Sequence, residues 1–482
     1  MAWTRAALAL FAAAALALAV VSGGSSDDPR TPAGLPGLAP PSLGTAVVGS
    51  GGLTAAIDAY GDVVDLRAPG PAGQALIDNP ADRQAAGTVA PETGIVPRVH
   101  IGSEPALPLW RASWVKQRYL SGTNVLVTEA RVASSKVTVV YAASANRLAC
   151  LTRSTGGSRV SIAAFDPAAQ SRLHCDERAA GAVVRAAIAS DRSWLAQARP
   201  LGDGAPGWAR QMYRRSLLTL RALTARRTGA VAAGARDGWA YAWPRDAGTA
   251  ALAYAAAGYR PEARRVARFL LGLDLGGAAR FQGDGSPVAG REAQGDASGW
   301  VDLAARASGL APRSQALPWR GRADYQEGEA GDYLANAIVA GARLSAFESL
   351  SGLAREAGGR GGLDSAASWA VRPYPQPELF AAVRRTLLRL VADGGRFGIG
   401  PSEDWAGNEA WTAPTAWAAW ALAALGERRE ASLLLADLRR AATASGTLPE
   451  RVDARSGIPR STTPLAWSHA FAILALRQLW PD

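Results

Sequence analysis

The chain has 482 residues and a formal net charge of +11 at pH 7, a length that accommodates two or three domains. Hydrophobic residues at 48% and charged residues at 19% are globular proportions, which exclude a disordered or collagen-like chain. Two cysteines and three histidines exclude a disulfide framework and the usual zinc modules, so we expect neither a metal nor a cofactor.

The positive charge is almost entirely arginine and is dispersed along the chain, with Lys116 and Lys136 the only lysines. Nucleic-acid binding requires basic residues clustered in a stripe, so we expect no nucleic-acid partner. Anionic polymers of a cell envelope are the more natural neighbours of such a surface.

The first 30 residues have the layout of an export segment. A positively charged start through Arg5 precedes an apolar run over residues 6–21, and a polar stretch follows. No Ala-x-Ala cleavage site follows Val21, so residues 1–30 are either a cleaved signal or a membrane anchor spanning residues 6–21. We therefore expect an extracellular protein or one tethered to the outer face of the cytoplasmic membrane. Cys150 and Cys175 are either paired there or two separate buried thiols.

The pattern then divides the chain into two domains. Residues 31–43 are rich in Pro and Gly and indicate a linker. Short β-branched runs such as NVLVTEARV, separated by turn residues, predict an antiparallel β-sandwich over residues 44–190. From Trp208 onward the hydrophobic period changes to about 3.6, which predicts an all-α domain over residues 205–482.

Helical periodicity recurs throughout this second domain, and no strand pattern interrupts it. Helical hairpins wound into an (α/α)6 toroid fit the pattern, whereas an α-solenoid would need a fixed internal repeat. The predicted helices cover residues 210–226, 246–258, 261–273, 297–308, 333–353, 377–392, 414–425, 427–442 and 464–479.

Tryptophan is the commonest aromatic residue, with 16 Trp against 10 Tyr and 8 Phe. Trp417 and Trp420, spaced i and i+3, are typical of a helix core. Other tryptophans fall in loops at predicted helix ends, where a flat ring with a polar edge suits the C–H face of a sugar. These residues indicate a carbohydrate cleft.

The densest such segment is RDGWAYAWPRD, which places Tyr241 and Trp243 just before Arg245 and Asp246. Asp246 is either a helix N-cap or part of a binding site. A capping role alone would leave the neighbouring aromatic residues and Arg245 unexplained. The Arg245 guanidinium can donate two hydrogen bonds and the Asp246 carboxylate can accept hydrogen bonds, which suits a pair of sugar hydroxyls.

A second segment, GTLPERVDARSGIPRSTTPLAWSH, carries Glu450, Trp467 and His469. Glu450 is either a solvated carboxylate paired with Arg451 or a general base that this arginine keeps ionised. His469 is more typical of a packed helical residue than of a catalyst.

The WPRD, TLPERVD and TPLAWSHA segments together resemble the glucoamylases, glycoside hydrolase family 15, and the similarity extends over most of residues 208–480. The resemblance implies a β-sandwich ahead of an (α/α)6 barrel. It also implies hydrolysis of an α-glucan or α-glucoside at its non-reducing end, with inversion, by one glutamic acid and one glutamate.

Carried over residue by residue, Arg245 and Asp246 match the pair that holds the terminal glucose, Glu450 matches the base, and Trp467 lies in the aromatic wall. Asp296, in REAQGDASGWVDLA, completes the expected binding set together with Tyr241 and Trp243.

The acid is expected in DYQEGEAGDYLANAI, where Glu327 is the first candidate and Glu329 a competitor. Gln326 replaces the family's tryptophan, and Arg451 replaces a glutamine beside the base. Glu403 or Glu409 is a further alternative, because a carboxyl next to Trp405 would have a raised pKa. A non-catalytic glycan-binding or envelope protein on the same fold is the alternative function.

Overall fold

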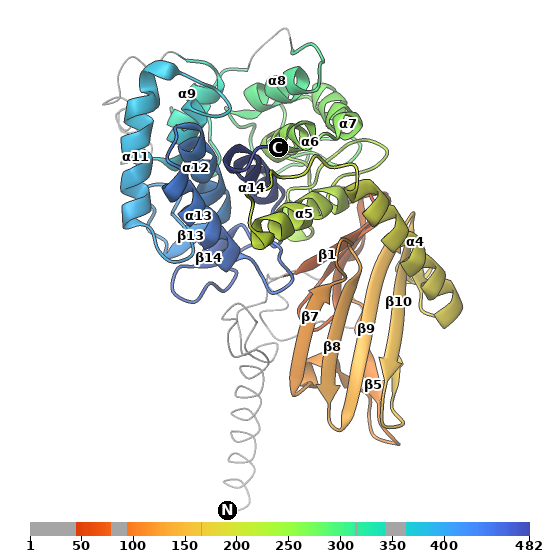
Figure 1. The fold of residues 1–482 in the computed structure, drawn as a ribbon. Coiled ribbons are helices and arrows are strands. Elements are labelled where there is room, and N and C mark those ends of the chain that lie inside the picture. Colours follow the sequence, from red (N-terminus) through yellow and green to blue (C-terminus); the bar gives the residue numbers. More distant parts are fainter. Residues whose placement is uncertain (1–44, 79–93, 165, 314–316, 329, 343–362) are drawn as a thin grey trace, which may run out of the picture.

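The computed structural model describes residues 45–78, 94–164, 166–313, 317–328, 330–342 and 363–482. The expected export segment or anchor (residues 1–30) and linker (residues 31–43) lie outside these ranges, as does Glu329. The described part divides into an N-terminal β-sheet region and a helix-rich region, which Figure 1 shows side by side.

Three sheets form the first region, antiparallel except where β10 and β12 pair in parallel. The first sheet holds β1 (Ala46–Gly49), β2 (Thr54–Ile57), β3 (Val63–Ala68) and β4 (Gln74–Asp78). The second holds β7 (Trp114–Tyr119), β8 (Leu126–Val132), β9 (Ser135–Ser144), β10 (Arg147–Ser154) and β12 (Leu173–His174). The third holds β5 (Arg98–His100), β6 (Leu107–Pro108) and β11 (Arg159–Ser161).

The alternation of side chains along these strands builds one core between the sheets. Val48 and Leu66 from the first sheet pack in the same buried cluster as Val139 and Tyr141 from the second. A disulfide joins Cys150 in β10 to Cys175 just after β12, so the two cysteines are paired.

Two α-helices were missed within the expected β-sandwich, the single-turn α3 (Pro167–Gln170) and the longer α4 (Glu177–Leu195). Helix α4 packs against the outer face of β9 and β10, and its Val183 and Ala187 share a small core with Ala142 and Ala149. The β pattern therefore stops at β12, and residues 177–190 are helical.

Each of the nine predicted helical segments contains a helix. The helices are α5 (Gly207–Ala222), α6 (Pro244–Ala256), α7 (Arg260–Leu271), α8 (Ala297–Ala307), α9 (Leu334–Val339), α11 (Phe380–Asp393), α12 (Thr412–Ala424), α13 (Arg428–Ala441) and α14 (Ala466–Leu479). Helix α9 is much shorter than predicted, and residues 343–353 of that segment are not described. A 3-10 helix, η4 (Ser365–Ala370), lies between α9 and α11 in the chain.

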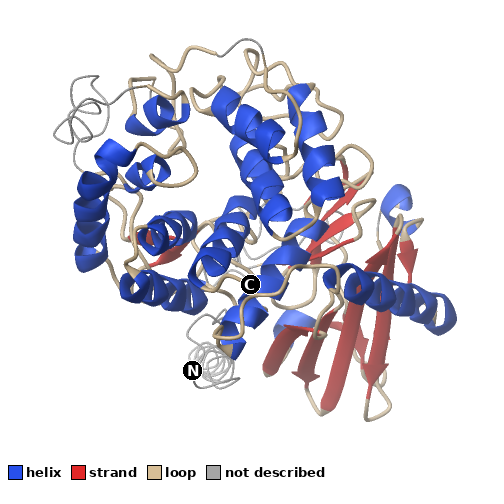
Figure 2. Cartoon of the chain, turned by 45° about the horizontal axis from the view of Figure 1, so that its top comes forward, coloured by secondary structure: helices blue, strands red, loops and turns tan. Residues whose placement is uncertain are grey.

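The helices are arranged as a ring, which Figure 2 shows nearly end-on. On its inner side, in the part of the chain that is described, α6 packs on α8, α9 on η4, η4 on α12, and α12 on α14, which returns to α6. Helices α8 and α9 are also neighbours in the ring. Gly299 of α8 lies so close to Val339 of α9 that a Cβ atom on residue 299 would not fit. Helices α5, α7, α11 and α13 pack outside this ring.

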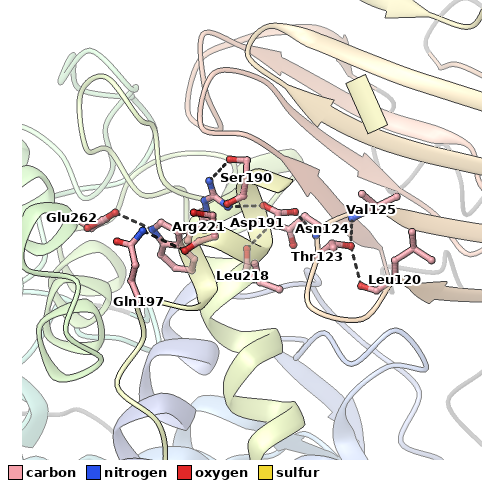
Figure 3. Close-up of polar contacts among 12 residues, drawn as sticks. Leu120, Thr123, Asn124, Val125, Ser190, Asp191, Gln197, Leu218, Arg221 and Glu262 are labelled. Carbon is pink, nitrogen blue, oxygen red and sulfur yellow. Dashed lines mark hydrogen bonds and ion pairs between the residues drawn. The ribbon is translucent and has the colours of Figure 1, made fainter. Parts of the chain in front are cut away.

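The two regions are tied together by buried polar contacts (Figure 3). Asn124, between β7 and β8, donates from Nδ2 to the Leu218 carbonyl of α5 at 2.9 Å, and its backbone N–H donates to Asp191 of α4 at 2.6 Å. Asp191 also pairs with Arg221 of α5 at 2.6 Å. Arg215 of α5 donates to the Asn124 side chain, so both regions share one hydrogen-bond network.

Among the described residues, no helix has the length and apolar character needed to span a bilayer. The same residues contain no cluster of three or more His, Cys, Asp or Glu side chains arranged to hold a metal ion.

Candidate active site

A cleft with a cavity of about 280 Å³ opens at one end of the helical ring. Its lining residues precede or begin the inner helices: Trp243, Arg245 and Asp246 at α6, and Trp467 at α14. The start of a helix leaves backbone N–H groups unpaired and carries partial positive charge. This end of the ring is therefore suited to acidic side chains and to the oxygen atoms of a ligand.

Arg245 lies at the bottom of the cleft, with its side chain 4% exposed. Its Nη1 atom donates to Asp296 Oδ2 at 2.9 Å and to Gln294 Oε1 at 3.0 Å. The guanidinium also lies 4.7 Å from the ring centre of Trp467, within the range of a cation–π contact. Asp296 does not line the cleft, so the residue expected to bind sugar holds Arg245 in place instead.

Asp246 is not a helix N-cap. Helix α6 begins at Pro244 with Trp243 at the cap position, and Asp246 is within the first turn. Burial raises the pKa of Asp246 to about 7, Glu450 adds to the increase, and Arg245 opposes it. Its Oδ1 atom is buried and has no hydrogen-bond partner among the described residues, which leaves an acceptor for a ligand.

Tryptophans form the walls of the cleft. Trp239, Trp243, Trp405, Trp411 and Trp467 all line it. The indole Nε1 atoms of Trp243 and Trp411 are buried without a partner in the described structure. Two polar ring edges are therefore available next to flat apolar faces, as a sugar site requires.

Tyr241 does not line the cleft, contrary to expectation. The guanidinium of Arg280 lies 5.1 Å from its ring centre and 5.7 Å from that of Trp243. Arg67 of β3 lies 5.8 Å from the same tyrosine ring. Tyr241 thus belongs to a stack that runs from the β-sheet region to the wall of the cleft.

Glu450 lies in the cleft at the end of the TLPE segment. Its backbone N–H donates to the Thr462 carbonyl at 2.9 Å, and its carbonyl accepts from Thr412 N at 3.0 Å. The Ser461 hydroxyl donates to Glu450 Oε2. The expected pairing of Glu450 with Arg451 is corrected, because Arg451 makes its ion pair with Glu409 at 3.5 Å.

Glu327 lies in the same cleft, in the loop before α9. Its backbone has a φ of 54°, in the left-handed region that a non-glycine residue adopts at a cost of about 1–3 kcal/mol. Its carboxylate forms an ion pair with Arg291, and Gln294 Nε2 lies 3.5 Å from Oε1.

The other described carboxyl candidates lie outside the cleft. Glu403 is exposed and accepts from the Leu363 backbone N–H at 3.1 Å. Glu409 accepts from Trp405 Nε1 at 3.1 Å and pairs with Arg451, so it supports two residues that line the cleft.

The residues predicted to be structural do have structural positions. Trp417 is fully buried and Trp420 is 8% exposed. His469 is fully buried; its Nε2 accepts from Leu448 N at 3.0 Å, and its Nδ1 lies 2.9 Å from the Ser216 hydroxyl. Burial holds the pKa of His469 well below its usual range, as expected of a packed neutral imidazole.

Comparisons with known proteins show what this chain resembles. The family model described as Glycosyl hydrolases family 15 matches residues 207–272, which include α5, α6 and the WPRD segment. The resemblance to family 15 is confirmed.

Solved structures show how far the similarity to glucoamylases extends. A bacterial glucoamylase complexed with acarbose aligns with a TM-score of 0.59 and 12% identity over 90% of this chain and 93% of its own, so the two share a fold. A glucoamylase from Saccharomycopsis fibuligera aligns with a TM-score of 0.45 and 13% identity over 58% of this chain and 97% of its own. A search of curated protein sequences gives no match.

Several residues of the cleft were not predicted as site residues. Arg291, Trp405, Trp411 and Arg451 line it, and Ser461 hydrogen-bonds to Glu450. Trp411 and Arg451 face each other because β13 (Glu409–Trp411) pairs with β14 (Arg451–Asp453). These residues come from separate loops. Arg291 begins the REAQGD segment quoted above, and Trp405 and Arg451 were considered only as neighbours of candidate carboxyl groups.

Proposed function

We propose that this chain is an inverting glycoside hydrolase that releases glucose from the non-reducing end of an α-glucan or α-glucoside. One observation carries the proposal: Glu327 and Glu450 line one cleft together with the buried pair Arg245 and Asp246. The unpartnered Asp246 Oδ1, Arg245 Nε and Trp243 Nε1 atoms are a donor and acceptor set suited to sugar hydroxyls.

In the proposed reaction, Glu327 donates its proton to the glycosidic oxygen as the bond from that oxygen to the anomeric carbon breaks. A water oxygen bonds to the anomeric carbon from the opposite face, and Glu450 takes the proton released by the water. Ser461 donates to Glu450 Oε2, which leaves Oε1 to accept that proton. Inversion requires carboxyl groups about 6.5–9.5 Å apart, with room for the water.

The same proposal covers the finer architecture and the location. We infer that the ring of helices is an (α/α)6 toroid, supported by the inner sequence of α6, α8, α9, η4, α12 and α14. We also propose that the protein is exported or anchored outside the cell, for which the composition of residues 1–30 is the support.

The test is a hydrolysis screen of the purified chain against maltose, isomaltose, trehalose, starch and dextran, with the anomer released followed by NMR. We expect Glu450→Gln and Glu327→Gln each to lower kcat by about a hundred- to ten-thousandfold, because general acid and base catalysis contribute that much. Glu403→Gln is the matched control, since it neutralises an exposed carboxylate outside the cleft. Retention of configuration, or full activity in Glu450→Gln, would contradict the mechanism.

A glycan-binding protein without activity is the second candidate. The ion pair between Arg291 and Glu327 favours it, because a nearby guanidinium disfavours the protonated carboxyl that an acid needs. Binding of these glucans without turnover by the wild-type chain would establish this alternative and overturn the hydrolase.

A further inference from the structure

The arginines of the cleft differ in depth. The side chain of Arg245 is 4% exposed, whereas those of Arg291 and Arg451 are 38% and 29% exposed. An enzyme acting at the end of a chain holds the terminal sugar at the bottom of its cleft, so the leaving group lies toward the opening. Arg291 and Arg451 are therefore placed on the leaving-group side.

Among the described residues, Arg291 has a direct ion-pair partner only while Glu327 is ionised. Its one ion pair among the described residues is with Glu327, and the neighbouring Gln294 is neutral. When Glu327 carries the proton that it donates, the guanidinium of Arg291 is left partly desolvated and unpaired. Burial and the nearby Arg280 lower the pKa of Arg291, and the charge of Glu450 opposes them only in part, so an added anion would stabilise this guanidinium.

Arg451 is also incompletely neutralised. Its Nη1 lies 3.5 Å from Glu409 Oε1, longer than the 2.7–2.9 Å of a strong charge-assisted hydrogen bond. Its Nε atom is buried and has no partner in the described structure. The guanidinium lies 5.6 Å from the ring centre of Trp411, which fixes it at the wall of the cleft.

We propose that the leaving-group side of the cleft binds an anionic group, a carboxylate or phosphate on the aglycone or the next sugar, held by Arg291 and Arg451. The anion takes the place of Glu327 as the partner of Arg291, and Glu327 is then free to hold its proton. The substrate class that follows is α-glucosides of acidic aglycones or acidic saccharides. This inference rests on the proposed hydrolase function and adds a specificity to it.

The experiment compares aryl α-glucosides that differ only at the para position of the ring: carboxylate, phosphonate, neutral carbamoyl and cationic aminomethyl. We expect kcat/KM for one or both anions to exceed that for the carbamoyl compound by about ten- to a hundredfold, since hydrogen bonds to charged groups have this strength. The aminomethyl compound should be the poorest substrate. The preference should shrink as salt rises, because these arginines are partly exposed.

Variants assign the preference to the two arginines. Arg291→Gln and Arg451→Gln should each reduce the ratio of anionic to carbamoyl kcat/KM toward one, and Arg291→Lys should retain part of it because the charge remains. Arg384→Gln is the matched control: it removes an exposed arginine of α11 that pairs with Glu427 and should keep the wild-type ratio.

Two kinds of failure are distinguishable. Turnover of all four compounds with no preference for either anion, or a preference that survives in both glutamine variants, would overturn the anionic subsite while leaving the hydrolase in place. Absence of turnover for all four compounds and for the neutral glucans would overturn the hydrolase itself.

Discussion

The carboxyl group of Asp246 is buried, yet one of its oxygen atoms has no hydrogen-bond partner among the described residues. Buried polar atoms normally have such a partner. The side chain of Asp246 is 3% exposed, and Oδ1 is the atom without a partner in the described structure. A buried polar atom without a partner costs about 1–3 kcal/mol. A group retained at that cost at the bottom of a cleft is best explained by a ligand that supplies the missing partner.

Asp246→Asn separates binding from stability. We expect kcat/KM on an α-glucoside to fall about ten- to more than a hundredfold, because a charged acceptor becomes a neutral amide. Stability should move the other way: the folded pKa is raised to about 7 from 3.8, so the wild-type carboxyl favours the folded state at low pH, and this contribution is lost as the pH rises through 7. The variant should therefore have a higher Tm than wild type at pH 8 and an equal Tm at pH 4.

Arg245→Lys tests the neighbouring donor. A lysine retains the charge but loses the planar fork that holds Asp296 and Gln294. We expect a fall in kcat/KM similar to that of Asp246→Asn, without the rise in Tm at pH 8. Unchanged kinetics in both variants would remove this pair from the site.

The candidate site was predictable where one segment holds several of its residues. The WPRD and TLPE segments led to Arg245, Asp246 and Glu450 because each carries more polar and aromatic residues than a cap or a turn needs. Asp296 contacts Arg245 and is not among the lining residues of the cleft, and Arg291, which does line it, was not identified. Contacts between loops that are distant in sequence decide which side chain faces a ligand. They also decide which residue holds that side chain in place.

At the scale of elements, helix α4 was not predicted, although the spacing of its buried residues in the sequence indicates a helix. Its buried positions Ala180, Val183, Ala187, Asp191 and Trp194 are spaced three and four apart, a helical period. Asp176 caps the helix by accepting from Ala179 N at 2.8 Å. The helical period of residues 177–195 was not recognised because these residues follow directly on a run of strands. A helix that covers a sheet belongs to the same domain, so no linker sequence marks where it begins.

The network around Asn124 predicts the strength of the contact between the two regions. Asn124→Ala removes the Nη2 acceptor of the buried Arg215 and the side-chain donor to the Leu218 carbonyl, although Arg215 keeps its bond to the Thr123 carbonyl. We expect a loss of about 2–4 kcal/mol in the free energy of unfolding, measured by urea titration. Gln197→Ala, on an exposed side chain, should change it by less than about 0.5 kcal/mol. Equal effects of the two substitutions would show that the network does not couple the regions.

At the scale of the whole molecule, several buried carboxyls make stability depend on pH. Burial raises the pKa of Asp58 to about 6 and that of Asp65 to about 7, and holds that of Asp62 well above its usual range. Between pH 3.8 and these values the folded state binds protons that the unfolded state has released. The free energy of unfolding therefore falls as the pH rises, by about 1.4 kcal/mol per pH unit for each group.

Asp62→Asn is the sharpest test of this dependence, because both carboxylate oxygens of Asp62 are buried without partners in the described structure. We expect the variant to unfold at higher urea concentration than wild type at pH 8, with a smaller fall in the midpoint between pH 5 and 8. The lowered pKa of His469 acts in the opposite sense, but only up to its usual value of 6.5. The lowered pKa of Asp453 affects stability only below 3.8, outside this range. A wild-type midpoint that rises steadily from pH 5 to 8 would contradict the dominance of the buried aspartates.

The closed ring also sets the order in which the protein can be completed during synthesis. Helix α14 packs against α5, α6 and α12, and it is the last of the ring elements to leave the ribosome. Until it does, the sides of α6 and α12 that pack against α14 are uncovered, and the cleft lacks the wall that contains Trp467. The β-sheet region can fold while synthesis continues, whereas the ring of helices can close only after α14 has been made. The incomplete ring of helices is therefore the part of the nascent chain with the greatest need of a chaperone.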